Sequence, residues 1–113
     1  MSEGGLAVAA AEMAFAGGLG MSLQLDAEPQ DCGDLAGAKR DACLLFSESN
    51  TRFVCEVPSD AAAAFEKHLQ GVPHACLGRV TADARLEITS GGTSVISAEL
   101  AKLKAAWQSP LDW

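Results

Sequence analysis

Basic residues are scarce in this sequence, and none of them form a cluster. The 113 residues include 8 lysines and arginines against 15 aspartates and glutamates, which gives a formal net charge of −7 at pH 7. A nucleic-acid surface needs local positive potential to displace the counterions of phosphates, so we expect no nucleic-acid partner. A small phosphate-bearing ligand is still compatible with this charge, because a few backbone N–H groups can bind one.

Aromatic residues are also few, and no low-complexity linker or internal repeat interrupts the chain. The hydrophobic content is 49%, although alanine supplies much of it. A chain of 113 residues is long enough for one hydrophobic core and too short for a typical two-domain enzyme. We therefore treat residues 1–113 as a single domain.

The cysteines lack the CxxC spacing of a zinc or redox motif, and three of the four lie in apolar patterns. We expect reduced thiols in the core of a cytoplasmic protein, rather than zinc ligands or disulfides. The acidic residues between positions 28 and 34 also lack the ligand spacing of a calcium loop, so we expect a solvated surface loop there and no metal site. The four cysteines are Cys32, Cys43, Cys55 and Cys76.

The longest apolar run, residues 2–20, lacks a basic flank and is marginal in length for a membrane span. It also lacks the positive segment that opens a signal peptide, so we expect no membrane association. Alanine and leucine favour a helix, and glycine pairs bound the run at both ends. Because this helix is apolar on nearly every side, we expect it to be covered on nearly every side, in the middle of a layered domain.

The rest of the chain alternates between strand and helix patterns. Residues 52–57 are apolar on both faces, which predicts a central strand. A short turn between residues 74–81 and 85–89 predicts an antiparallel hairpin. We expect Ser59 and Ser97 to cap the helices that follow them. The full set is strands at 20–26, 52–57, 74–81, 85–89 and 93–96 and helices at 38–46, 59–70 and 98–107, which predicts an α+β domain with a mixed sheet.

The polar stretch 47–51 lies between an apolar helix end and the expected strand. A polar loop held by two rigid elements can position a ligand accurately. Alternatively, its serines and asparagine have their usual roles in a turn. The sequence contains no Ser/His/Asp set, no pair of catalytic acids and no phosphate-binding glycine loop. The residues alone indicate only a cytoplasmic α+β domain.

Four segments, taken in order, resemble the last domain of the formylglycinamide ribonucleotide amidotransferases, also called phosphoribosylformylglycinamidine synthases. The resemblance covers nearly the whole chain, and the first two segments are specific in combination. It implies the C-terminal fold of the aminoimidazole ribonucleotide synthetase superfamily, a layered α/β/α domain with a mixed sheet. The segments are SEGGLAVAAAEMAFAGGLG, LLFSESNTRFVCEVP, GVPHACLGRVT and LAKLKAAWQSPL.

The resemblance implies a ligase of de novo purine biosynthesis. In that family, ATP activates the amide oxygen of formylglycinamide ribonucleotide, and ammonia from glutamine displaces phosphate to give formylglycinamidine ribonucleotide. The implied cofactors of the complete enzyme are ATP and Mg²⁺, and the implied partners are the upstream domains of the same synthetase and a glutaminase subunit or domain.

The sequence departs from the family by containing only the final domain. The domains that carry the main magnesium and nucleotide ligands lie upstream in the family, and an aspartate that opens the family motif would precede Met1. We therefore expect a fragment of a larger enzyme that is inactive alone, with no catalytic or metal-binding residue of its own.

The resemblance assigns a few positions to a cleft. Synthetases of this family contain two tandem halves, each ending in a domain like this one. The loop after the LF motif contacts substrate in the first half. In this copy, which resembles the second half, the loop can face an auxiliary nucleotide or only a neighbouring domain. Glycines at the first helix start permit either backbone approach to a ligand or close packing. The cleft candidates are Glu48, Ser49 and Asn50, where asparagine replaces the usual glutamine, and the cleft or interface loop is Ser2, Glu3, Gly4 and Gly5.

Two other functions fit the same residues. One is a free-standing interaction or scaffold domain of the superfamily that catalyses nothing. The other is the equivalent domain of a sister enzyme, such as selenophosphate synthetase or thiamine-phosphate kinase. The segments LFSES and RFV disfavour this second alternative.

Overall fold

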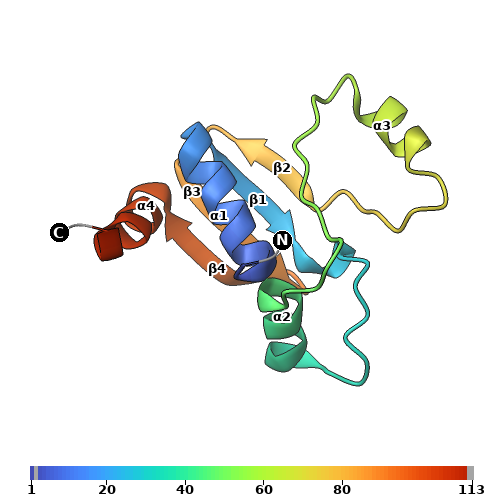
Figure 1. Ribbon diagram of the computed structural model, residues 1–113, viewed down its shortest axis with the longest axis horizontal. Helices are drawn as coiled ribbons and strands as arrows, with labels where there is room; N and C mark the ends of the chain where they lie inside the picture. Colours follow the sequence, from blue (N-terminus) through green and yellow to red (C-terminus); the bar gives the residue numbers. More distant parts are fainter. Residues whose placement is uncertain (2, 112–113) are drawn as a thin grey trace.

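The structure, a computed structural model, describes residue 1 and residues 3–111. Figure 1 shows helices gathered around a twisted sheet, with one excursion of the chain that carries α3 away from it. The short 3₁₀ helices Leu25–Ala27 and Ser109–Leu111 follow β1 and α4. The elements are α1 (Gly5–Gly17), β1 (Gly20–Gln24), α2 (Gly37–Phe46), α3 (Ala62–His68), β2 (Gly78–Thr81), β3 (Arg85–Ser90), β4 (Thr93–Glu99) and α4 (Leu100–Gln108).

The four strands form one mixed sheet in the order β2-β1-β3-β4. β1 pairs antiparallel with β2 and parallel with β3, and β4 pairs antiparallel with β3. The predicted fold class, α+β with a mixed sheet, is confirmed. The predicted hairpin between residues 74–81 and 85–89 is wrong, because β1 lies between β2 and β3.

A glycine explains how so short a connection can pass over a strand. Residues 82–84 cross the sheet at Gly20, the first residue of β1. A Cβ atom at Gly20 would collide with the carbonyl oxygen of Asp83. The absent side chain therefore lets the connection lie directly on the strand, which the length of the turn alone does not reveal.

The core lies between α1 and one face of the sheet. Met21 and Leu23 of β1 stand beside Leu86 and Ile88 of β3, in register, and all four are buried. Side chains alternate across a strand, so Ser22 and Gln24 point to the opposite, polar face. The domain therefore has two layers, the sheet and, on its apolar face, the helices α1, α2 and α4.

Helix α1 packs between α2 and α4 and against the sheet (Figure 1). Its buried side chains, Leu6, Ala7, Ala10 and Ala14, lie on one side. The remaining residues of the helix after Gly5 are half-buried or, at Glu12, Ala16 and Gly17, exposed. The expectation that this helix is covered on nearly every side is therefore wrong, because α2, α4 and the sheet cover only part of its surface.

Helix α4 is held against α1 by an aromatic contact and a hydrogen bond. The rings of Trp107 and Phe15 lie 5.7 Å apart between centroids, and Trp107 Nε1 donates to Glu12 Oε1 at 3.0 Å. The helix begins two residues later than predicted, because β4 continues through Ser97 to Glu99. Ser97 is therefore a strand residue and not a helix cap.

The chain between α2 and β2 differs most from the prediction. Residues 52–57 do not form a strand, although the pattern predicted a central one, and Phe53 is 82% exposed. Cys55 and Cys76 are exposed, so the expectation of core thiols is wrong for these two. Helix α3 has no buried residue and begins at Ala62 without a side-chain cap, so Ser59 does not cap it. The apolar alternation here lacks a neighbouring strand to pair with.

No helix of the described residues is long and apolar enough to cross a membrane.

Candidate functional site

Two of the predicted loops meet at the amino-terminal end of α1. The backbone N–H of Gly4 donates a hydrogen bond to Oε1 of Glu48, with a nitrogen–oxygen distance of 2.9 Å. Glu48 lies just after the carboxyl-terminal end of α2, so the contact joins the starting loop of one helix to the exit loop of another. The structure thus brings together one residue from each of the two sets that the resemblance assigned to a cleft.

The two glycines of the first loop adopt a backbone conformation that other residues rarely adopt. Gly4 has a φ of +71° and Gly5 a φ of +67°. A Cβ atom at Gly5 would lie 2.7 Å from the carbonyl oxygen of Leu45 and 2.9 Å from the Cα of Phe46. Glycine at position 5 therefore allows the backbone of α1 to touch the last turn of α2.

Glu48 also supplies a negative charge that α1 lacks. The helix has no acidic residue in its first turn and no side-chain cap. The free N–H groups at a helix start carry partial positive charge and favour an anion or carboxylate nearby. The Glu48 carboxylate fills this role from a different part of the chain, which fixes the exit loop of α2 onto α1.

The neighbouring residues of the exit loop point outward. Ser49 and Asn50 are exposed. Thr51 has a φ of +61°, and its hydroxyl donates to the Asn50 carbonyl oxygen at 2.6 Å. A β-branched residue is strained in this left-handed region, and such strain persists where surrounding contacts hold the turn in place. The turn thus presents one hydroxyl and one amide group to the outside, between two anchored residues.

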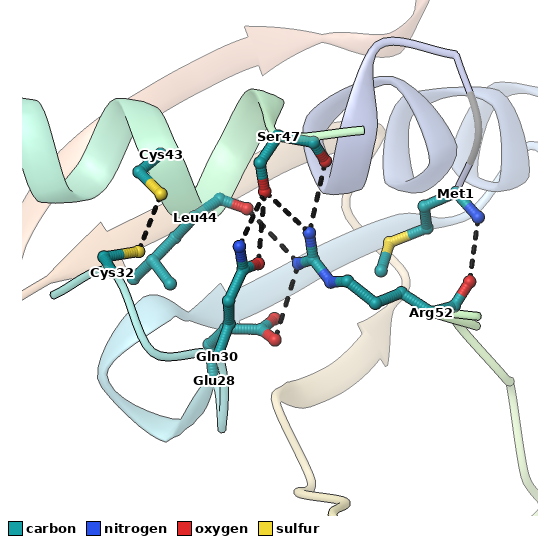
Figure 2. Close-up of polar contacts among 8 residues, drawn as sticks. All are labelled: Met1, Glu28, Gln30, Cys32, Cys43, Leu44, Ser47 and Arg52. Atoms are coloured by element: carbon teal, nitrogen blue, oxygen red, sulfur yellow. Dashed lines mark hydrogen bonds and ion pairs between the residues drawn. The ribbon is translucent and has the colours of Figure 1, made fainter. Parts of the chain in front are cut away.

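Arg52 is the second anchor of the loop (Figure 2). Its Nη1 donates to the Ser47 hydroxyl at 2.9 Å and to the Ser47 carbonyl oxygen at 3.2 Å. Its Nη2 lies 3.4 Å from Oε1 of Glu28 and donates to the Leu44 carbonyl oxygen at 3.5 Å. A guanidinium group suits this position because it is a planar fork with five donors.

The ion pair between Arg52 and Glu28 is well shielded from water. The Arg52 side chain is 14% exposed and that of Glu28 is 7% exposed. Removal of one partner would leave the other charge buried and uncompensated, which costs more than an exposed pair contributes. Gln30 extends the network, since its amide and the Ser47 hydroxyl exchange hydrogen bonds of 2.9 and 3.1 Å.

Sequence reasoning missed the role of Arg52, because it placed this residue in a central strand, and residues 52–57 do not form a strand. A signal was present: Arg52 is the one basic residue between Arg40 and Lys67, and it follows the polar loop directly. The loop that holds Glu28 and Gln30 was expected to be solvated, yet both side chains turn inward to this network (Figure 2).

The remaining predicted residues of the first loop add little to this geometry. Glu3 is exposed. Ser2 lies outside the described residues. The amino group of Met1 donates to the Arg52 carbonyl oxygen at 2.8 Å, which brings the first residue of the chain beside the same loop.

A separate groove lies where the chain leaves the site. Its volume is about 620 Å³, and it is bounded by residues 53–59, α3 and residues 74–80. Met21 and Leu23 of β1 form part of its floor, and its lining is mainly apolar. The expected strand 52–57 therefore runs as an extended segment along one side of a groove.

The described residues offer binding groups and anchoring groups at this site. They include no group of three or more His, Cys, Asp or Glu side chains that could hold a metal ion. Hydroxyl and amide groups such as those of Ser49 and Asn50 can donate hydrogen bonds to a phosphate or a sugar. The arrangement therefore suits a wall that contacts a ligand or a neighbouring domain.

Comparison with known proteins gives this chain a family. Residues 1–101 match the family model described as AIR synthase related protein, C-terminal domain. The chain is 41% identical over 111 residues to the phosphoribosylformylglycinamidine synthase subunit PurL of Deinococcus radiodurans. It is 35% identical over 119 residues to the protein of that name from Prochlorococcus marinus and 36% identical over 115 residues to that from Synechococcus elongatus.

These similarities cover nearly all of this chain and little of the relatives. The alignments include 97–98% of this sequence. The chain spans 14% of the length of each of the three relatives.

Proposed function

This chain belongs to the family described as AIR synthase related protein, C-terminal domain. We propose that it serves as the last domain of a phosphoribosylformylglycinamidine synthase. One observation carries the proposal. The similarity to synthase subunits extends along 97% of the chain at 41% identity, so it includes the helices, the strands and both loops of the candidate site. A short shared motif would not extend so far.

The proposed reaction is that of the complete enzyme. It converts formylglycinamide ribonucleotide, glutamine, ATP and water into formylglycinamidine ribonucleotide, glutamate, ADP and phosphate, and Mg²⁺ would supply charge stabilisation for the phosphoryl transfer. The chemistry of phosphoryl transfer requires positioning and charge stabilisation more than any covalent role of the protein. No described side-chain cluster of this chain fits a metal ion, so we assign Mg²⁺ to none of its residues.

Within that enzyme, the exit loop of α2 contributes one wall of a cleft. Ser49 and Asn50 would donate hydrogen bonds to the substrate or to a nucleotide, since their polar groups are exposed. Glu48 and Arg52 hold the loop in place from either side, through the Gly4 N–H group and the Ser47–Glu28 network. The loop at Glu3, Gly4 and Gly5 would lie at the rim of the same cleft or at the contact with a neighbouring domain.

The proposed partners are the other domains of the synthase and a glutaminase that supplies ammonia.

The groove along residues 53–59 favours a second candidate function, an interaction domain without catalysis, because it combines an apolar lining with the 82% exposed Phe53. Both functions predict that the 113-residue chain alone does not catalyse amidation with ATP.

A domain exchange separates the two functions. In the test, this chain replaces the matching segment of a related synthase subunit, and formylglycinamidine ribonucleotide formation is measured with glutamine and ATP. We expect the chimera to keep activity within about tenfold of the parent enzyme, and the double change Ser49→Ala/Asn50→Ala to raise KM. The matched control is Ser59→Ala/Gln70→Ala, two exposed positions of the excursion, which should leave KM unchanged.

A folded, assembled chimera without activity would refute the synthase role and favour the interaction domain. Amidation by the chain alone would refute both.

A further inference from the structure

Two cysteine thiols face each other beside the candidate site. Cys32 lies in the loop before α2, and Cys43 lies on α2 itself, 11 residues along the chain. Their sulfur atoms are 2.8 Å apart, and Figure 2 shows the two side chains pointing toward one another. Both residues are half-buried, whereas Cys55 and Cys76 are exposed.

Only a small movement of the two sulfur atoms separates this contact from a disulfide bond. A disulfide requires a sulfur–sulfur distance of about 2.05 Å, so the sulfur atoms need to approach by less than about 1 Å. Cys32 is in a loop, which can make this adjustment more easily than the helix that carries Cys43. The partial exposure of both residues leaves the thiols open to a small reagent.

The two cysteines belong to the two segments that enclose Arg52. The loop of residues 28–36 carries Glu28, whose carboxylate pairs with the guanidinium, and Gln30, which bonds Ser47. Helix α2 and the residue after it provide the Leu44 carbonyl oxygen and the Ser47 hydroxyl. A bond between Cys32 and Cys43 would therefore tie together both halves of the Arg52 network.

We propose that Cys32 and Cys43 form a reversible intramolecular disulfide by exchange with a small-molecule disulfide, and that this bond holds the loop of residues 28–36 against α2. The proposal is independent of the proposed synthase function, since it concerns only contacts within this chain.

The exchange balances in two steps. The thiolate of one cysteine attacks a sulfur atom of the small disulfide, so that a mixed disulfide forms and one small thiol leaves. The second cysteine then gives up its proton and attacks the protein sulfur of the mixed disulfide, and a second small thiol leaves. The two cysteines are oxidised, and one small disulfide is reduced to two thiols.

The contact also affects the protonation of Cys32. The hydrogen bond with Cys43 raises the pKa of the Cys32 thiol above its usual value, and partial burial raises it further. Since the thiolate is the reacting form, formation of the bond should become faster as pH rises through the alkaline range.

The test uses the 113-residue chain with Cys55→Ser and Cys76→Ser, which leaves only the proposed pair. The protein is equilibrated in buffers of reduced and oxidised glutathione, alkylated with iodoacetamide and weighed by mass spectrometry. We expect both thiols to disappear in one transition, with a loss of two hydrogen atoms in mass. Trypsin cleaves after Lys39 and Arg40, so the oxidised protein should give a crosslinked pair of peptides, 1–39 with 41–52.

Two results would overturn the bond itself. One is stable glutathione adducts on Cys32 and Cys43 without the crosslinked peptide pair. The other is a crosslink that appears only between two chains on non-reducing size-exclusion chromatography. Cys43→Ser and, separately, Cys43→Ala serve as controls that should lose the transition, so a folding defect in one variant does not decide the outcome.

The effect on the loop has its own readout. The melting temperature of the oxidised form should exceed that of the reduced form by about 5–10 °C, as expected for a short closed loop in a small domain. Hydrogen exchange of residues 28–36 should be slower in the oxidised form. Equal exchange in the two forms, with the crosslink present, would refute the proposed hold on this loop.

Discussion

The N–H group of Gly4 and the carboxylate of Glu48 join two segments that are 44 residues apart in the chain. The contact fixes the loop after α2 to the start of α1, where the two sets of predicted site residues meet. Its strength therefore decides how rigidly Ser49 and Asn50 are presented.

The first prediction concerns this hydrogen bond. Glu48→Ala should lower the free energy of unfolding by about 0.5–1 kcal/mol, because an exposed hydrogen bond and a favourable helix-dipole contact are both lost. Glu48→Gln should keep most of the stability, since its amide oxygen can still accept from Gly4. Urea denaturation measures both changes. Glu66→Ala on the exposed helix α3 is the matched control, and an equal loss there would contradict the prediction.

The second prediction concerns the close approach of α1 to α2. Gly5→Ala should cost more than about 3 kcal/mol, because the new Cβ atom meets the Leu45 carbonyl oxygen in addition to the left-handed backbone strain. Gly18→Ala has a similar φ of +69° but open space around it, so it should cost only about 1–2 kcal/mol. Thermal unfolding of both variants gives the comparison. Similar losses would mean that contact with α2 contributes nothing.

Local patterns predicted the elements that bury one regular face. The apolar run of α1 is visible in the sequence because alanine and leucine favour a helix, and β1 and β3 are visible because their alternation matches the period of a strand. Residues 52–57 show the limit of this reasoning. Their alternation is typical of a strand, but a strand also requires a neighbour with which to pair, and the local pattern does not show whether one is present.

The candidate site was also predictable only in part, because its contacts join segments that local patterns treat separately. The resemblance named Glu48 and Gly4, whereas the hydrogen bond between them depends on how α1 packs against α2. Arg52 was misassigned because its expected strand does not form. The contact between Cys32 and Cys43 depends on the path of a polar loop, for which hydrophobic periodicity gives no information.

The third prediction concerns the shielded ion pair. Arg52→Ala should cost about 1–3 kcal/mol, because it leaves the Glu28 carboxylate, 7% exposed, without its cation. Arg52→Lys should recover only part of this, since one ammonium group does not reproduce the fork that reaches both Ser47 and Glu28. A double-mutant cycle with Glu28→Gln, measured by urea denaturation, should give a coupling energy of about 1–2 kcal/mol.

The control for that cycle is the exposed pair of Arg85 and Glu99, which lie 3.7 Å apart with side chains 46% and 50% exposed. Its coupling energy should be below about 0.5 kcal/mol, because water and salt screen it. Equal coupling in the two cycles would show that shielding does not strengthen the Arg52 contact.

The fourth prediction concerns the polar face of the sheet, where hydrogen bonds from Ser94 and Ser97 hold the pKa of the Glu87 carboxyl below its usual value. The Ser94 hydroxyl donates to Glu87 Oε1 at 2.6 Å. Since the folded-state pKa is depressed, this contact stabilises the protein fully above the unfolded-state pKa, and the stabilisation is lost as pH falls through the folded-state pKa.

Ser94→Ala should raise the pKa of Glu87 toward its usual value, whereas Ser94→Thr should keep it low. Carboxyl carbon shifts followed by NMR during acid titration measure this directly, and an unchanged pKa in Ser94→Ala would show that the hydroxyl is not the main cause.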